Sequence, residues 1–148
     1  MARFFLDSSI VACADDLDAP AKQSAALGPL ERAYGDAAGV LSLQVLQEYY
    51  VTATRKLGVP TADARRKVEL LSRPAVVRLD PTDILAAIDM QGLHGCSFWD
   101  ALIVQAALPA RCTVLYTEDL QPGMRIGGLQ IVNPFEGVKG ERDEGLMA

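Results

Sequence analysis

Short apolar runs typical of β-strands alternate along this chain with longer segments of helical periodicity. The strand-like runs cover residues 3–6, 39–41, 75–79, 113–116 and 129–132. The helical segments cover residues 8–14, 21–34, 43–57, 61–72, 82–91 and 98–108. Gly28-Pro29 predicts a break or kink in the second helix, because proline forces the residue before it out of the helical conformation. Such alternation is typical of a parallel sheet covered by helices. The sequence therefore predicts an α/β fold of three layers, α/β/α, with a central five-stranded parallel sheet.

A chain of 148 residues, 50% of them hydrophobic, can form one hydrophobic core but not two. We expect a single domain over residues 1–136 and a polar, flexible C-terminal tail over residues 137–148. The longest apolar stretches, residues 40–46 and 101–108, are far shorter than the roughly 20 residues that a membrane helix needs. Asp7 comes too early for a signal peptide. The sequence therefore predicts a cytoplasmic protein with no membrane partner.

Charge and residue types narrow the classes of function. The net charge of −5 argues against a broad basic surface for long nucleic acids, but not against a nuclease with an acidic centre. Three cysteines without a paired spacing and a single histidine, His94, support neither a zinc site nor a Ser-His-Asp triad. No glycine-rich motif for a dinucleotide or a nucleoside triphosphate is present. Carboxylates remain as the candidate functional groups.

Four acidic residues lie near predicted strand ends or in early helical turns. Asp7 ends the first strand-like run, and Asp119 comes soon after the fourth. Asp100 is in the first turn of an apolar helix that we expect to be buried, and Glu48 is in the first two turns of the helix that follows residues 39–41. Ligands of open α/β sheets bind at the carboxyl ends of the strands. Carboxylates gathered there raise one another's pKa unless a divalent ion neutralises them, and an all-oxygen site favours Mg²⁺ or Mn²⁺.

Other roles for the same residues stay open at this point. One hydroxyl of the pair Ser8 and Ser9 either contacts a metal-bound water or orients Asp7, or the two serines only help to start a helix. Thr117 either hydrogen-bonds a metal-bound water or simply ends its strand. Asp100 can complete a capping box with Ser97. In a non-catalytic α/β binding module, all of these acids would be structural caps. A phosphatase that forms an aspartyl-phosphate is a third possibility, although it typically needs an acid at position 9.

The chain resembles the PIN-domain ribonucleases, and in particular the VapC-type toxins of type II toxin–antitoxin pairs. The resemblance covers nearly the whole chain and depends on the order and spacing of residues 5–9, 47–49, 97–101, 116–120 and 132–135. It implies that residues 1–136 form a PIN-like domain. It also implies that Asp7, Glu48, Asp100 and Asp119 are the acidic metal-binding quartet, with Ser9 and Thr117 as polar helpers. Members of the family often have asparagine where Ser9 stands.

The resemblance implies a Mg²⁺-dependent endoribonuclease that hydrolyses phosphodiester bonds of a transfer or ribosomal RNA, with Mn²⁺ as a substitute metal. It further implies a cognate antitoxin protein that blocks the acidic site, and a homodimer. Two basic residues, Arg55 and Arg73, are candidates for steadying the RNA backbone. The alternative remains a binding module without catalysis.

Overall fold

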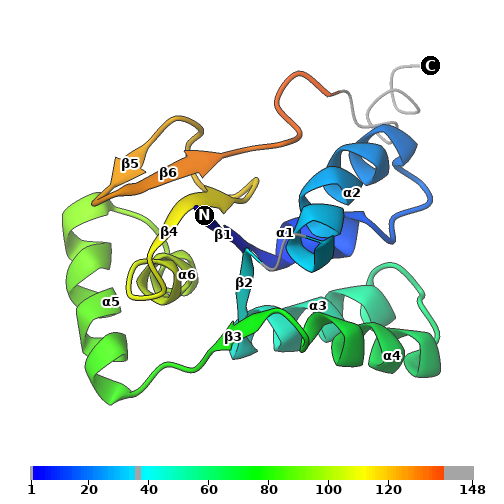
Figure 1. Cartoon of the computed structure of the whole chain (residues 1–148), viewed down its shortest axis with the longest axis horizontal. Helices are drawn as coiled ribbons and strands as arrows, with labels where there is room; N and C mark the ends of the chain where they lie inside the picture. Colours follow the sequence, from blue (N-terminus) through cyan, green and yellow to red (C-terminus); the bar gives the residue numbers. More distant parts are fainter. Residues whose placement is uncertain (1, 36–37, 139–148) are drawn as a thin grey trace.

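A mixed β-sheet forms the centre of the protein, as the computed structural model of residues 2–35 and 38–138 shows. Six strands among these residues lie in the order β3-β2-β1-β4-β6-β5 (Figure 1). Neighbouring strands are parallel, except that β5 is antiparallel to β6. The strands are β1 (Arg3–Leu6), β2 (Gly39–Ser42), β3 (Ala75–Val77), β4 (Cys112–Tyr116), β5 (Arg125–Ile126) and β6 (Leu129–Val132).

Helices cover both faces of this sheet, which confirms the predicted α/β architecture. Helices α1 and α2 lie on one side of the sheet in Figure 1, and α5 and α6 lie on the other. Helix α2 packs against β1 and β2, α6 packs against β2 and β4, and α3 pairs with α4. The helices are α1 (Ser8–Cys13), α2 (Pro20–Gly35), α3 (Leu43–Arg55), α4 (Thr61–Leu71), α5 (Pro81–His94) and α6 (Phe98–Ala107).

The sheet has one strand more than the five that the sequence predicts. All five predicted strands are present, and the sixth is β5, which pairs with β6 through a turn at Gly127-Gly128. Gly127 has a φ of 60°, a conformation that costs glycine little. A two-residue strand is too short to show an alternating pattern, but the Gly-Gly pair before residues 129–132 is a hairpin signal.

Helix α2 runs through Gly28-Pro29, so the predicted break is wrong. Pro29 is buried, together with Ala26, Leu30 and Ala33 on the same helix. Packing of this face compensates for the backbone hydrogen bond that proline cannot donate. The predicted tail, residues 137–148, lies almost entirely outside the described residues.

The arrangement of β1 in the middle of the sheet positions the candidate site. Phe5 and Leu6 are completely buried between the helical layers, and Asp7 follows them at the carboxyl edge. The backbone N–H of Asp7 donates to the carbonyl of Tyr116 at 3.0 Å, which ties the end of β1 to the end of β4. Residues after β1, β2 and β4 therefore meet at one edge of the sheet.

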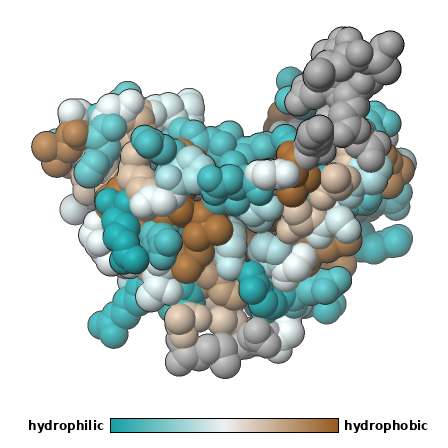
Figure 2. Space-filling view, turned by 90° about the horizontal axis from the view of Figure 1, so that it is seen from above, coloured by the Kyte–Doolittle hydropathy of each residue, from teal (hydrophilic) through white to brown (hydrophobic). Residues whose placement is uncertain are grey.

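The exposed surface carries scattered apolar groups. On the face seen in Figure 2, hydrophobic residues form separate patches among hydrophilic ones. Within residues 2–35 and 38–138, no helix combines the length and the apolar character that crossing a membrane would require.

Candidate metal centre

Asp7 is the innermost acid of the site, with only 3% of its surface exposed. It is the N-cap of α1, and its Oδ1 accepts a hydrogen bond from the Ser8 backbone N–H at 2.7 Å. Its Oδ2 accepts one from the Thr117 hydroxyl, also at 2.7 Å. Both carboxylate oxygens are thus fixed by donors on two different segments of the chain.

Asp100 and Asp119 converge on Asp7. Each of the three offers a carboxylate oxygen, and these oxygens lie within 4.8 Å of one another. The backbone N–H of Asp119 donates to the Thr117 hydroxyl oxygen at 3.1 Å, so Thr117 bonds to Asp7 and to Asp119. Three of the four predicted acids, two after strands and one at the start of a helix, therefore do come together, while their role as metal ligands stays a prediction.

Asp100 is half-buried rather than buried, because the first turn of α6 reaches the surface and leaves Trp99 61% exposed. The Asp100 backbone N–H donates to Ser97 Oγ at 3.1 Å, which caps the helix. Among the described hydrogen bonds, the Asp100 carboxylate makes no return bond to the Ser97 amide. Only half of the predicted capping box is therefore formed, and the carboxylate faces Asp7 and Asp119 instead.

The three acids repel one another and are partly desolvated. Burial raises the pKa of Asp7 above its ordinary value, and nearby Glu48 and Asp100 raise it further, while the bonds from Thr117 and Ser8 oppose the change. Burial, followed by the charges of Asp7 and Asp100, raises the pKa of Asp119 from 3.8 to about 6. A divalent cation would relieve this repulsion, and three carboxylates suit a hard ion such as Mg²⁺ or Mn²⁺. The residues present fit a metal site.

Three solved structures with a similar fold are those of a bacterial toxin or of toxin–antitoxin complexes. A Mycobacterium tuberculosis toxin, VapC20, described as cleaving the sarcin–ricin loop, has a TM-score of 0.61 and 18% identity over 76% of this chain and 86% of its own. DNA-bound VapBC from Salmonella typhimurium has a TM-score of 0.62 and 17% identity over 90% of this chain and 99% of its own. A toxin–antitoxin complex from Klebsiella pneumoniae has a TM-score of 0.60 and 20% identity over 90% of this chain and 98% of its own.

The chain has the VapC fold. This is the PIN-like architecture that the sequence predicts, with a mostly parallel sheet between helices. No family model and no curated protein sequence matches the chain. At 17 to 20% identity, the likeness to VapC structures concerns the fold, and the chemistry has to be argued from the side chains.

Glu48 lies beside the three acids of this VapC fold rather than among them. It is half-buried on α3, and its Oε1 accepts a hydrogen bond from the Ser8 hydroxyl at 3.1 Å. The same hydroxyl lies 3.4 Å from Asp7 Oδ1. Ser8 therefore links Glu48 to the cluster. The residues left Ser8 and Ser9 both open for this position, and the resemblance favoured Ser9.

The two predicted polar helpers differ in position. Thr117 is buried, with 1% of its surface exposed, and contacts Asp7 directly. Ser9 is one step further away: its Oγ accepts from the Glu118 backbone N–H at 3.4 Å. The Glu118 carboxylate turns toward Lys22, at 3.3 Å, so Asp119 rather than Glu118 joins the acid cluster.

The two arginines predicted to contact RNA lie in different parts of the molecule. Arg55 is exposed in the last turn of α3. Arg73 is exposed just before β3, and its charge acts on Tyr34 at the end of α2. Because β3 is parallel to β2, residues that precede it lie at the amino edge of the sheet, away from the acids. The structure does not place Arg73 at the site.

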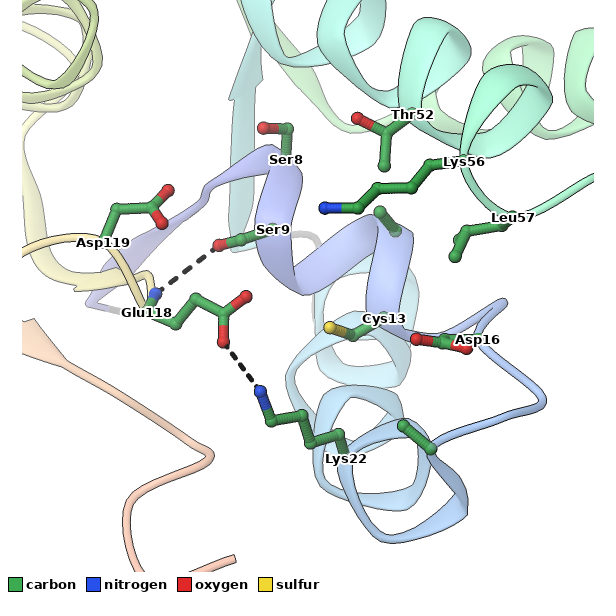
Figure 3. Close-up of a pocket in the computed structure, with 12 residues that line it drawn as sticks. Ser8, Ser9, Cys13, Asp16, Lys22, Thr52, Lys56, Leu57, Glu118 and Asp119 are labelled. Atoms are coloured by element: carbon green, nitrogen blue, oxygen red, sulfur yellow. Dashed lines mark hydrogen bonds and ion pairs between the residues drawn. The ribbon is translucent and has the colours of Figure 1, made fainter. Parts of the chain in front are cut away.

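A cavity of about 410 Å³ adjoins the acid cluster, and its lining includes two lysine side chains that the sequence analysis did not assign to the site. It lies between α1, the start of α2, the end of α3 and the segment after β4 (Figure 3). Lys22 and Lys56 line it, as does Asp119. The only signal in the sequence was the Arg55-Lys56 pair, in which the second residue rather than the first lines the cavity.

Proposed function

We propose that this chain is a Mg²⁺-dependent endoribonuclease that acts as the toxin of a toxin–antitoxin pair. The observation that carries the proposal is the convergence of Asp7, Asp100 and Asp119 to within 4.8 Å, at the carboxyl edge of a sheet with the VapC fold. Glu48 is proposed as the fourth acid, and Mn²⁺ as a substitute metal. VapC20 is described as cleaving the sarcin–ricin loop, which supports ribosomal RNA as the class of substrate, with transfer RNA as the alternative.

The proposed partners follow from the complexes that share the fold. Structures from Klebsiella pneumoniae, Salmonella typhimurium and Haemophilus influenzae contain a toxin with its antitoxin. We therefore propose a cognate antitoxin protein for this chain, a homodimer, and action in the cytoplasm. Arg55 stays a candidate for contact with the RNA backbone outside the cavity.

The protein's own contribution to hydrolysis is to fix the acids and position the phosphate. A bound divalent cation supplies a water of lowered pKa and neutralises charge on the phosphate. Asp7, Asp100 and Asp119 would hold the ion. Thr117 and the Ser8 amide keep the Asp7 carboxylate in one orientation, so little reorganisation is needed when substrate arrives. Glu48, held by Ser8, adds negative charge beside the three.

The competing function is a non-catalytic binding module, and the observation that favours it is that Asp7 does cap α1. Two helices provide a matched test. Asp100 and Asp83 occupy the third residue of α6 and α5, but only Asp83 completes a capping box, with Asp80. We expect Asp100→Asn to abolish RNA cleavage and Mn²⁺ binding with little change in stability. We expect Asp83→Asn to cost about 0.5 to 1 kcal/mol of stability and to leave both activities intact.

Calorimetric titration with Mn²⁺ measures metal binding. Cleavage of total RNA, followed by sequencing of the new RNA ends, measures the nuclease activity. A cap-only protein would bind no Mn²⁺ at millimolar concentration. Cleavage that persists in the purified Asp100→Asn protein would remove this acid from the proposed site.

A further inference from the structure

The cavity beside the acid cluster is lined by three carboxylates and two ammonium groups, and the two ammonium groups differ in their partners. Lys22 is paired with Glu118 at 3.3 Å, and Asp16 accepts the backbone N–H of Asp18 at 3.1 Å. Asp119 belongs to the acid cluster. Lys56 is the remaining charged group of the lining, and among the described residues it has no ion pair.

Lys56 is placed to contact something inside the cavity. It is the C-cap of α3, and its ammonium group extends across the cavity toward α1 (Figure 3). The hydroxyls of Ser9 and Thr52 line the same space, and Leu57 adds an apolar wall. A lone ammonium group with nearby hydroxyls is suited to a phosphate, because each can donate hydrogen bonds to its oxygens.

The cavity is continuous with the acid cluster, since Asp119 belongs to both. A strand whose scissile phosphate is held at the acids would therefore find space for its next nucleotide in the cavity. The volume of about 410 Å³ lies within the range of about 300 to 1,000 Å³ that small-ligand sites occupy. Polar groups at one side and Leu57 at another match a nucleotide, which has a charged phosphate and an apolar base face.

We propose that this cavity receives the RNA nucleotide next to the scissile phosphate and that Lys56 binds that nucleotide's own phosphate. This assignment depends on the proposed function. It makes Lys56 a substrate-binding residue that acts on affinity, whereas Asp7, Asp100 and Asp119 act on the chemical step.

The test uses the full-length protein and a short single-stranded RNA that the wild type cleaves in Mg²⁺. Lys56→Gln removes the charge, Lys56→Arg keeps it, and Arg66→Gln removes one charge from an exposed position of α4 outside the cavity lining. For Lys56→Gln we expect KM to rise about tenfold with kcat within about twofold. The slope of log KM against log salt should become shallower by about 0.7, the value for one lost phosphate contact with single-stranded nucleic acid. Lys56→Arg and Arg66→Gln should behave like the wild type.

Two results would overturn the inference and leave the proposed function in place. One is wild-type cleavage with an unchanged KM and salt slope in Lys56→Gln. The other is an equal effect of Arg66→Gln, which would indicate general electrostatic attraction rather than a phosphate contact. If the wild type cleaves no RNA at all, the proposed function fails and the inference fails with it. Because the Lys56 side chain is exposed, its substitution leaves the core intact.

Discussion

Two acids flank the short helix α1, and their neighbours carry opposite charges. Asp15, just after the helix, accepts hydrogen bonds from the Tyr49 hydroxyl and from Lys67 Nζ, the latter at 2.9 Å. Asp7, just before the helix, has two other acids for neighbours. In the ranges that the structure describes, none of Asp7, Asp100 and Asp119 forms an ion pair with a basic residue.

The difference separates an acid with a structural role from acids that are proposed to bind an ion. Lys67 is itself mostly buried, and burial lowers its pKa while Asp15 opposes that change, so each charge stabilises the other. At Asp7 the neighbouring charges raise the pKa further instead of compensating for burial. A cation supplied by the chain makes the first region structural. In the second region the proposed divalent cation from solution would take that place.

Replacing the two acids by asparagine should have opposite consequences, and the larger is at Asp7. Asp7→Asn should lower RNA cleavage by about 100-fold or more, because a ligand of the ion is lost. Its free energy of unfolding should stay within about 1 kcal/mol of the wild type, since asparagine caps helices about as well as aspartate. Single-turnover cleavage and urea unfolding measure the two effects. Unreduced cleavage in a folded Asp7→Asn protein would contradict the assignment of this acid.

Divalent ions should stabilise the protein through the region around Asp7 and not through the region around Asp15. At a concentration about 100 times the dissociation constant, Mg²⁺ or Mn²⁺ should add about 2.7 kcal/mol to the free energy of unfolding. Asp7→Asn should lose this gain, whereas Asp15→Asn should keep it. Thermal unfolding with and without EDTA checks the prediction. An equal gain in both variants would place the ion elsewhere in the molecule.

Asp15→Asn should cost stability rather than activity. Lys67 would lose its carboxylate partner while 18% of its side chain is exposed, which should lower the free energy of unfolding by about 2 kcal/mol. Cleavage per folded molecule should be unchanged. Urea unfolding gives the first quantity, and active-site-normalised cleavage gives the second. A loss of cleavage without a loss of stability would show that the two regions are not separate.

The last effect concerns pH in the absence of divalent ions. The pKa of Asp119 is about 6 in the folded protein and 3.8 ordinarily, so the folded state binds its proton more tightly than the unfolded state does. Its contribution to stability is therefore fully present below about pH 4 and is lost as the pH rises through 6. Compared with Asp119→Asn in EDTA, the wild type should lose stability over this window. Saturating Mn²⁺ should remove the difference, and a wild type that gains stability relative to the variant would contradict the sign.

Much of the site could be predicted because it depends on the direction of strands. Asp7 and Asp119 follow two parallel strands, and parallel strands place their carboxyl ends at one edge. Asp100 could be placed near them because the first turn of its helix begins at that same edge. Local pattern also identified both possible uses of Asp100, as a cap and as a ligand, but only the three-dimensional arrangement shows which way its carboxylate faces.

The remaining features depend on tertiary packing that no local pattern encodes. Ser8 rather than Ser9 contacts Glu48, and which hydroxyl faces α3 depends on the rotation of a six-residue helix. Arg73 belongs to a basic segment of the sequence. It lies at the amino edge of the sheet because it precedes β3, and the sequence analysis did not use this direction of the strand. Lys56 lines the cavity only because α1, α2 and α3 enclose one.

The hydrogen bond between Thr117 and Asp7 joins residues 110 positions apart in the chain, and this separation has a consequence for the protein during its own synthesis. The ribosome makes Asp7 first, and Asp100, Thr117 and Asp119 all lie more than 90 residues further along the chain. A nascent chain therefore has only one of the three converging acids until β4 and the residues after it have emerged. The chemistry proposed for the folded protein therefore cannot begin before that point of its synthesis.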